Sequence, residues 1–226
     1  CARPTEHPYQ VSSWSEMKDY YDPNNVIRAA AMMVSVADEF KGNNNFEYDL
    51  VDIVRQAIAE KGRLTEKVVE AAFAAGDKKL YKDASDRFLR LILLQDELLA
   101  TRPEFKVGTW IARARSLGST PEEKELYEWN ARVQITTWGN RLAADEGGLR
   151  DYAHREWNGI LKDFYYMRWK TWFDYQTRLL DGRKTAAIDF YAIEERWTKA
   201  TNVYSSEPEG DCILTVKRIF VEIFGK

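Results

Sequence analysis

The sequence predicts an all-α protein, a bundle of about eight helices in one domain. Helix-capping residues and helix-ending glycines recur along the whole chain, and apolar residues repeat with helical spacing between them. Runs of alternating apolar and polar residues are short, and residues 132–138 (RVQITTW) form a candidate strand. We divide the chain into a lead-in segment, residues 1–22, and the helical domain, residues 23–226.

The first half of the chain predicts three helices. Asp22 supplies a capping carboxylate before Pro23, and this helix is predicted to run to residue 41, ahead of Gly42. A long helix follows over residues 45–76, with Gly62 as the point of any bend. The third covers residues 78–102 behind an Asp77 cap, and its buried stripe is predicted to be Leu80, Ala84, Phe88, Leu91, Gln95 and Leu98.

The second half predicts helices over residues 104–117 and 119–139. The latter opens with a capping box formed by Thr120 and Glu123 around Pro121. Gly147 and Gly148 then break the chain, and the last two helices are predicted over residues 189–202 and 211–224.

Residues 151–174 carry an aromatic side chain on nearly every side of the helix that they are predicted to form. A helix that is apolar all round is a buried helix, so most of these rings are expected to pack in the bundle. Buried phenols and indoles need hydrogen-bond partners, and this mixture suits a helix with one flank on a polar cleft. The rings are Tyr152, Trp157, Phe164, Tyr165, Tyr166, Trp169, Trp172 and Phe173.

Composition excludes several classes of protein. The net charge of −3, with both signs mixed, argues against a nucleic-acid-binding face. Apolar runs stay shorter than the roughly 18–20 residues of a transmembrane segment. Two histidines and two cysteines leave no basis for a histidine-based triad, a metal site or any cofactor, and glycine-rich phosphate loops are absent. A glycosidase needs only a pair of carboxylates, but no pair stands out among 36 acidic residues.

Several stretches in order resemble the C-terminal helical domain of α-N-acetylglucosaminidases, glycoside hydrolase family 89. They are residues 46–58 (FEYDLVDIVRQAI), 107–115 (VGTWIARAR) and 127–139 (YEWNARVQITTWG), then Asp151-Tyr152-Ala153, Gly159, the Tyr165, Arg168 and Trp169 pattern, and Gly210-Asp211. The opening CARP is also similar to the segment that leads into this domain. Two departures are Met167, where relatives often have proline, and a segment between Gly139 and Asp151 that is longer than in the animal enzymes.

The resemblance implies a retaining, exo-acting hydrolase that removes terminal α-linked N-acetylglucosamine. Its catalytic carboxylates would lie on a (β/α)₈ barrel, which takes about 250 residues and is not in this chain. The helical domain would wall the sugar pocket of that barrel, and this chain alone would be inactive. The barrel domain of the same enzyme and a glycan with terminal α-N-acetylglucosamine are therefore the expected partners. Self-association of the isolated domain is expected through the face that the barrel would cover.

The resemblance also implies which residues touch the sugar. Tyr152 is the first choice, as a hydroxyl that hydrogen-bonds the sugar, and Trp138 is the second, as an apolar face. Arg168, Tyr165 and Asp49 are further candidates, although an arginine–carboxylate pair that ties helices together would explain Arg168 and Asp49 equally well. Trp138 could equally be a packing residue.

Alternative functions stay open at this point: a non-catalytic carbohydrate-binding or helical docking module, or a helical scaffold with no role in sugar binding. The first residues lack the apolar region of a secretory signal. For a bacterial protein the resemblance implies a secreted, periplasmic or cell-surface location, and for the animal relatives a lysosomal one.

Overall fold

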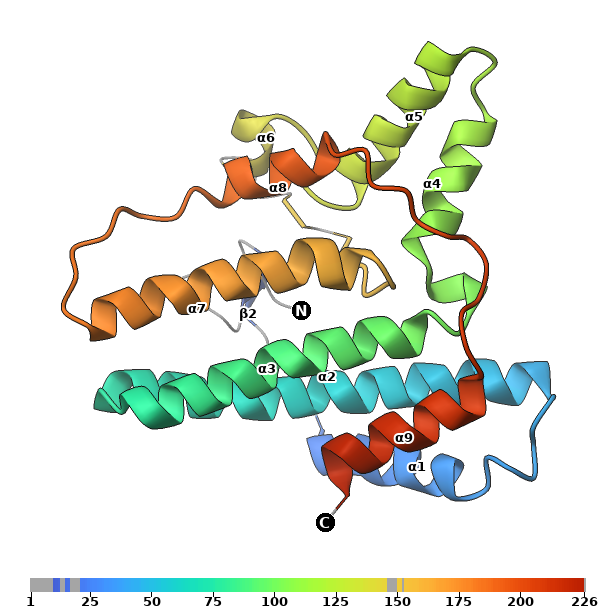
Figure 1. The fold of residues 1–226 in the computed structure, drawn as a ribbon, viewed down its shortest axis with the longest axis horizontal. Coiled ribbons are helices and arrows are strands. Elements are labelled where there is room, and N and C mark those ends of the chain that lie inside the picture. The colour runs from blue at the N-terminus through green and yellow to red at the C-terminus, as the bar shows by residue number, and fades with distance from the viewer. Residues whose placement is uncertain (1–9, 13–14, 17–20, 146–149, 152, 226) are drawn as a thin grey trace.

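The computed structural model describes residues 10–12, 15–16, 21–145, 150–151 and 153–225. Within these residues the chain is all-α apart from one small hairpin in the lead-in segment, β1 (Gln10–Ser12) paired antiparallel with β2 (Ser15–Glu16). The helices, labelled in Figure 1, are α1 (Pro23–Ser35), α2 (Asn44–Ala75), α3 (Lys78–Leu99), α4 (Val107–Ser116), α5 (Pro121–Gln134), α6 (Arg141–Asp145), α7 (Tyr166–Leu180), α8 (Phe190–Thr198) and α9 (Cys212–Phe224). The predicted all-α fold class is confirmed.

The long helices α2 and α3 lie side by side and form the base of the bundle (Figure 1). Asn43 caps α2, and Gly76 ends it in the left-handed conformation at φ 69°, a backbone angle that glycine adopts without steric cost. Asp77 then caps α3 through the N–H of Leu80. The predicted turn between these two helices is therefore confirmed, and α2 continues unbroken through Gly62.

Helix α7 packs on α3 through aromatic rings. Trp169 lies 4.5 Å from Phe88 between ring centroids, and Phe173 meets Phe88 edge to face at 5.7 Å. All three side chains are buried. Full burial of one such ring contributes about 1.5–3 kcal/mol, so this contact is a main part of the core. The prediction that most rings of residues 151–174 belong to the core is confirmed for these positions.

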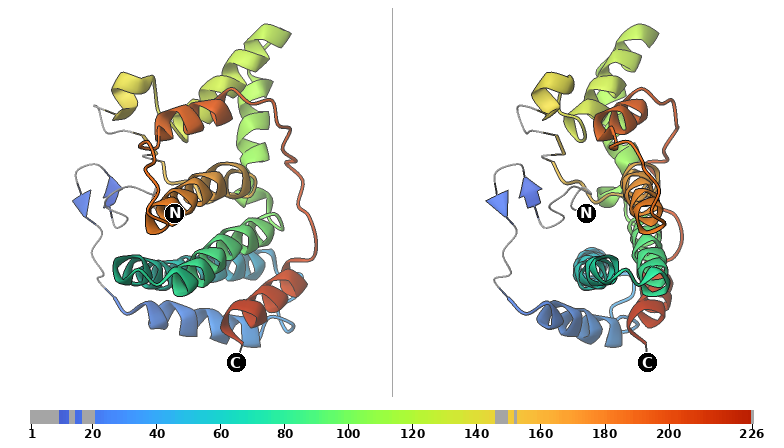
Figure 2. Two further views of the ribbon diagram at one scale, coloured as in Figure 1. Left: turned by 60° about the vertical axis from the view of Figure 1, so that its left-hand side comes forward. Right: turned by 90° about the vertical axis from the view of Figure 1, so that its left-hand side faces the viewer.

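The turned views show how the elements are layered (Figure 2). Helices α8, α7, α3 and α9 follow one another down one layer, and α2 and α1 lie on one side of it. The β1–β2 hairpin and α6 lie on that same side. Helices α4 and α5 form an antiparallel hairpin that projects from the end of the layer (Figure 1).

A strap formed by residues 199–211 joins α8 to α9 and crosses α4 (Figure 1). It lies so close to α4 that a Cβ on Gly108 would stand 2.2 Å from the carbonyl oxygen of Ser205. Gly159, at φ +91°, likewise lies under the ring of Tyr204. These two glycines let the strap lie directly on the bundle.

Several local predictions are wrong. Helix α5 ends at Gln134, not at residue 139, and α8 ends at Thr198, not at residue 202. Helix α1 ends at Ser35, not at residue 41, because the Ser35 hydroxyl donates to the Met32 carbonyl and the β-branched Val34 and Val36 lower the helix propensity. Leu80 is exposed, since it lies in the first turn of α3, beyond the packed stripe. Residues 132–134 complete α5, and residues 135–137 form a turn, so the candidate strand does not exist.

A further correction concerns the aromatic-rich residues 151–174. The helical backbone starts at Ile160 and passes through one π-helical segment, Leu161–Tyr165, into α7. The described residues between Asp151 and Gly159 precede the helix as turns and extended chain. Asp151 and His154 have positive φ angles of 60° and 45°, which a right-handed helix does not allow. A helical wheel therefore does not apply to positions 151–159.

Candidate functional site

The structure places the predicted site residues in three different settings. Tyr152 lies outside the described residues. Trp138 follows α5 in a turn and keeps 44% of its surface exposed. Tyr165 and Arg168 are fully buried where α7 begins. Asp49 is exposed on α2, whereas Arg168 pairs with Asp151 and Glu194.

Arg168 lies at the centre of a buried charged cluster. Its Nη1 donates to Asp151 Oδ2 at 2.8 Å, and its Nε is 3.2 Å from Glu194 Oε1 on α8. Arg150 approaches the other oxygen of Glu194 at 3.4 Å. Burial opposes the charge of Arg168, but Glu194 and Asp151 outweigh it and raise the pKa of the guanidinium. The cluster thus joins two carboxylates to two guanidinium groups and is balanced in charge.

Tyr165 completes this cluster from the π-helical segment. Its hydroxyl donates to Asp151 Oδ1 at 2.5 Å, so both oxygens of the Asp151 carboxylate are bound. Burial and the neighbouring Asp151 carboxylate raise the pKa of Tyr165 well above its usual range, because the phenolate would be desolvated beside a negative charge. Tyr165 therefore acts as a hydrogen-bond donor that stays protonated.

Asp151 also joins two segments with strained backbone. Trp138, Asp151 and His154 are the non-glycine residues in the described chain with positive φ, at 64°, 60° and 45°. Each such residue costs on the order of 1–3 kcal/mol and persists only where surrounding contacts hold it. The N–H of Asp151 donates to the carbonyl oxygen of Thr136 at 2.6 Å, two residues before Trp138. The two strained segments are thus directly bonded.

Next to this junction, residues 156–159 are fixed to the base of the bundle. Glu156 accepts from Arg55 on α2 and from Gln95 on α3, both at 2.8 Å. The buried Asp96 on α3 accepts from the N–H of Gly159 at 2.7 Å and thereby caps the start of the helix that becomes α7. Burial raises the pKa of Asp96, although these N–H donors act in the opposite direction.

Sequence reasoning missed Asp151 and Glu194 as members of the site. Asp151 was visible only as part of the Asp151-Tyr152-Ala153 match, and its αL backbone had no sequence signal because aspartate also occurs in ordinary turns. Glu194 lies in α8, 26 positions after Arg168 in the chain, and its burial follows from tertiary packing. Arg–carboxylate pairing was predicted correctly as a type of interaction, but its partners are Asp151 and Glu194.

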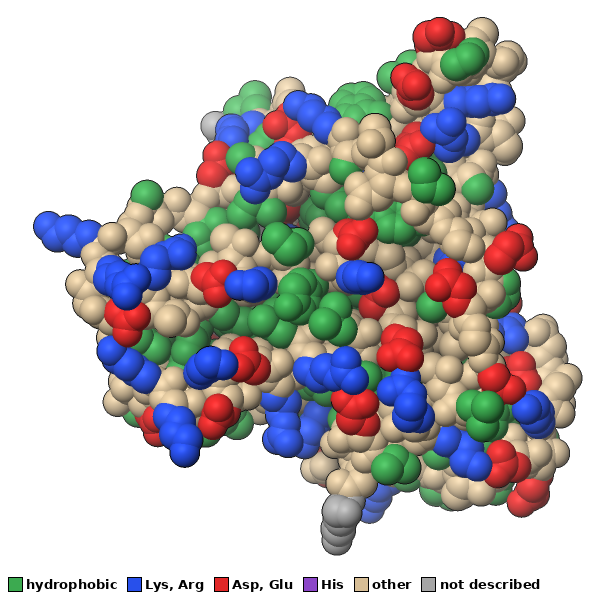
Figure 3. All heavy atoms as spheres, viewed as in Figure 1, with side chains coloured by type: hydrophobic (Ala, Val, Ile, Leu, Met, Phe, Trp, Pro, Cys, Tyr) green, Lys and Arg blue, Asp and Glu red, His purple; other side chains and the backbone are tan. Residues whose placement is uncertain are grey.

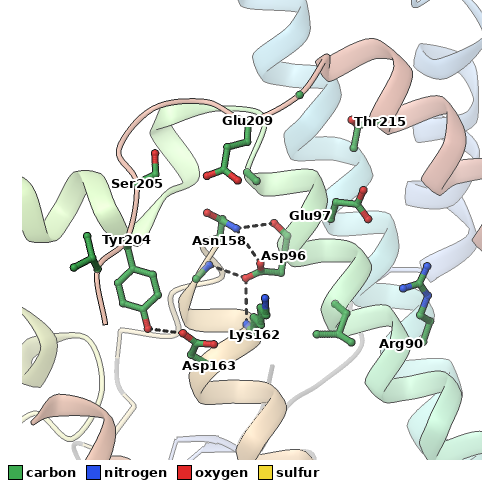
Figure 4. Close-up of a pocket in the computed structure, with 15 residues that line it drawn as sticks. Arg90, Asp96, Glu97, Asn158, Lys162, Asp163, Tyr204, Ser205, Glu209 and Thr215 are labelled. Atoms are coloured by element: carbon green, nitrogen blue, oxygen red, sulfur yellow. Dashed lines mark hydrogen bonds between the residues drawn. The ribbon is translucent and has the colours of Figure 1, made fainter. Parts of the chain in front are cut away.

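A pocket of about 760 Å³ lies between α3, the strap and α9, and its lining residues are drawn in Figure 4. Its polar side chains bind one another. The Tyr204 hydroxyl donates to Asp163 at 2.8 Å, and the amide of Asn158 donates to Asp96 at 2.9 Å (Figure 4). None of the predicted site residues that the structure describes lines this pocket. We interpret it as the joint that fixes the strap.

The face drawn in Figure 3 shows hydrophobic side chains over α7 and in the space between α7 and α3. A smaller cavity of about 600 Å³ beside α7 is lined by apolar and polar residues, and the apolar ones include Leu93, Phe164, Met167 and Trp197. Among the described residues, no helix has the length and apolarity needed to cross a membrane. In the same part of the chain, His, Cys, Asp and Glu side chains do not gather in a group of three that could hold a metal ion.

The comparisons with known proteins agree with one another. Residues 1–222 match the family model described as the alpha-N-acetylglucosaminidase (NAGLU) C-terminal domain. A human alpha-N-acetylglucosaminidase is 26% identical over 215 residues, which are 91% of this chain and 28% of the human protein. The chain thus spans about a quarter of the length of this relative.

Among solved structures, the chain is similar to a family 89 glycoside hydrolase from Clostridium perfringens. In the complex of that enzyme with its substrate GlcNAc-alpha-1,4-galactose, the match has a TM-score of 0.92 at 36% identity and covers 98% of this chain and 26% of the clostridial chain. The complexes with 2-acetamido-1,2-dideoxynojirmycin and with PUGNAc give the same TM-score and identity over 99% of this chain. The chain therefore belongs to the family of α-N-acetylglucosaminidase C-terminal domains of glycoside hydrolase family 89.

Proposed function

We propose that this chain is the C-terminal domain of a retaining exo-α-N-acetylglucosaminidase and forms one wall of its sugar pocket. The observation that carries this proposal is the match at TM-score 0.92 to about a quarter of a clostridial enzyme that was solved with GlcNAc-alpha-1,4-galactose. The catalytic carboxylates would lie on a (β/α)₈ barrel outside this chain. The substrate class is a glycan that ends in α-linked N-acetylglucosamine.

The contribution of this domain to catalysis would be positioning. An exo-acting enzyme has to hold one terminal sugar with its anomeric carbon in line with the nucleophile, and a wall beside the pocket excludes water and limits the orientations of the ring. Trp138 supports this role because its indole is half-exposed and its backbone is strained, with a positive φ angle. Such strain is often found at functional sites. Tyr152 is proposed to hydrogen-bond the sugar, on the basis of the Asp151-Tyr152-Ala153 match.

The other three candidates contribute differently. Tyr165 and Arg168 have no exposed surface, so we assign them a supporting role beneath the wall. Asp49 is exposed on α2, and it stays the weakest candidate because the residues bonded to the strained segments do not include it.

The proposed partner is the barrel domain of the same enzyme, which would cover part of the surface now exposed. Trp138, just before α6, and Leu142, within α6, are large hydrophobic residues with 44% and 61% of their surface exposed. In the absence of the barrel, we expect such a face to promote self-association of the isolated domain. For a bacterial protein, a secreted, periplasmic or cell-surface location would give access to glycans.

The test compares this chain with the full-length enzyme that contains it, using an aryl α-N-acetylglucosaminide as the substrate. The full-length enzyme is expected to release N-acetylglucosamine with the α configuration retained at first, as seen by proton NMR, and the chain alone is expected to give no turnover. Turnover by the isolated chain would contradict the proposal, and so would a full-length enzyme that does not hydrolyse this substrate. Tight glycan binding by the isolated, inactive chain would instead favour a carbohydrate-binding module.

A further inference from the structure

We propose that Asp151 is a positioning residue that fixes Trp138 in the wall of the sugar pocket, with Arg168 and Tyr165 holding Asp151 in place. This inference deepens the proposed function, because it rests on the assignment of Trp138 to that wall. It concerns a residue that touches neither the sugar nor the reacting atoms.

Three hydrogen bonds converge on Asp151. Its two carboxylate oxygens accept from Tyr165 at 2.5 Å and from Arg168 at 2.8 Å, and its N–H donates to Thr136 at 2.6 Å. Asp151 is 1% exposed, so water does not compete with these bonds. The position of its backbone is therefore set by the start of α7.

Asp151 is connected to Trp138 through the backbone of the turn that follows α5. The carbonyl of Thr136 is held by Asp151, and the N–H of Trp138 donates to the carbonyl oxygen of Val133 at 2.8 Å. These bonds hold the turn on both sides of residue 137, which is itself buried. Trp138 follows at φ 64°, a conformation that a tryptophan adopts only when its neighbours impose it.

The buried cluster costs desolvation free energy. Two carboxylates and two guanidinium groups are removed from water in this cluster, and a well-packed apolar core would stabilise the fold equally well. Buried charged groups with directional bonds fix one geometry, whereas apolar contacts allow sliding. The bonds from Tyr165 and Arg168 to Asp151, and from Asp151 to Thr136, end on the two strained segments, which indicates that the conformation of these segments is what this part of the cluster determines.

The experiment uses the mild variant Tyr165→Phe, which removes one bond to Asp151 and keeps the ring, and the stronger variant Asp151→Asn, in which asparagine tolerates the positive φ. Tyr81→Phe is the matched control. Tyr81 is also buried, and its hydroxyl donates to Gln176 at 2.9 Å near the far end of α7. All three variants alter a polar contact of α7 or of the π-helical segment that leads into it, but only the first two act on Asp151.

The first readout does not depend on activity. The chain is labelled with 5-fluorotryptophan, and the Trp138 signal among the eight tryptophans is assigned in fluorine NMR with Trp138→Phe. Tyr165→Phe and Asp151→Asn are expected to shift or broaden this signal, and Tyr81→Phe is expected to leave it in place. An unchanged Trp138 signal in folded Tyr165→Phe overturns the proposal, even if Asp151→Asn does not fold.

The second readout is kinetic and is measured in the full-length enzyme. Tyr165→Phe is expected to lower kcat/KM for the aryl substrate roughly tenfold, since small displacements of groups at a site slow the reaction. Tyr81→Phe is expected to lower Tm as much as Tyr165→Phe does and to leave kcat/KM unchanged. Equal kinetic losses in both variants would mean that the cluster acts on stability alone, and would overturn the proposal. A displaced Trp138 signal with unchanged kinetics would support the positioning by Asp151 and contradict the role of Trp138 in the sugar pocket.

Discussion

At the scale of single residues, the backbone strain of this domain is concentrated in one place. The non-glycine residues with positive φ among those described are Trp138, Asp151 and His154, and the first two are joined through the Asp151–Thr136 bond. Strain is tolerated where it has a use or where the surroundings impose it. Here the buried cluster around Arg168 imposes the strained conformation, and the proposed sugar pocket would give it a use.

The strain at Trp138 can be measured by comparing Trp138→Asn with Trp138→Ala. Both variants lose the indole, but asparagine occupies the left-handed region more readily than alanine does. Trp138→Asn is therefore expected to be more stable by roughly 1 kcal/mol in urea unfolding. Both variants should reduce kcat/KM of the full-length enzyme to a similar degree. Equal stability of the two variants would mean that the backbone at this position is not strained.

The role of Tyr152 rests on the family resemblance and can be tested by Tyr152→Phe in the full-length enzyme. Loss of one hydrogen bond to an uncharged sugar hydroxyl costs about 0.5–1.5 kcal/mol, so kcat/KM should fall by a few-fold to roughly tenfold. Tm should not change, because the ring is kept. The assignment fails if Tm falls while kcat/KM of the folded enzyme does not, since Tyr152 would then be a packing residue.

At the scale of elements, the strap decides how α4, α7 and α9 are held together. Tyr204 of the strap donates to Asp163 in the π-helical segment and accepts from the indole of Trp197 on α8 at 3.0 Å. Lys106, just before α4, is buried and pairs with Glu209 of the strap at 2.7 Å. A segment without regular secondary structure thus bonds to α8, to the π-helical segment and to the residue before α4, and the last two are distant from it in sequence.

Two helical glycines give a matched test of this close packing. Gly108→Ala is expected to lower Tm by several degrees, because the new methyl would overlap the Ser205 carbonyl at 2.2 Å and the strap would have to move. Gly62→Ala is expected to raise Tm slightly, since its methyl would meet Phe88 at an ordinary 3.7 Å and alanine favours the helix by about 0.5–1 kcal/mol. Thermal unfolding followed by circular dichroism measures both, and a stable Gly108→Ala variant would refute the close approach.

At the scale of the whole molecule, stability at alkaline pH reflects the buried phenols. Burial raises the pKa of Tyr81, Tyr165 and Tyr204 above the ordinary value of 10.0. In the unfolded chain the same phenols ionise near pH 10.0, so between these values the unfolded state binds fewer protons than the folded state. The free energy of unfolding must then decrease as the pH rises.

We therefore expect the free energy of unfolding to be nearly constant between about pH 7 and pH 9 and to fall steadily above about pH 10. Urea unfolding at several pH values measures this slope, and absorbance at 295 nm follows ionisation of the phenols. Tyr81→Phe should reduce the slope, because it removes one of the three groups. A native protein whose tyrosines all ionise with ordinary pKa values would contradict the burial of these hydroxyls.

Much of the local structure could be predicted from the sequence, because its causes are local. The Asp22 and Asp77 caps, the Thr120–Glu123 capping box and the Gly76 terminus all appear as predicted. Each depends on the reach of a short side chain or on the freedom of glycine over three or four residues. The ordered motifs also identified the family, since they are read from the chain directly.

The site could be predicted only in part, because its geometry depends on residues that are far apart in the chain. Arg168 and Tyr165 were found as candidates, but their burial and their common partner Asp151 follow from the way α7, α8 and the turn after α5 pack together. The start at Ile160 of the helical backbone that leads into α7 was missed for a similar reason, since Asp96 on α3 supplies the cap. The sequence by itself determined the all-α class, the capped helix starts and the family, whereas only the tertiary structure decided where several helices end and which side chains meet at Asp151. Local conformation is governed by neighbours along the chain, and a buried charged cluster is governed by neighbours in space.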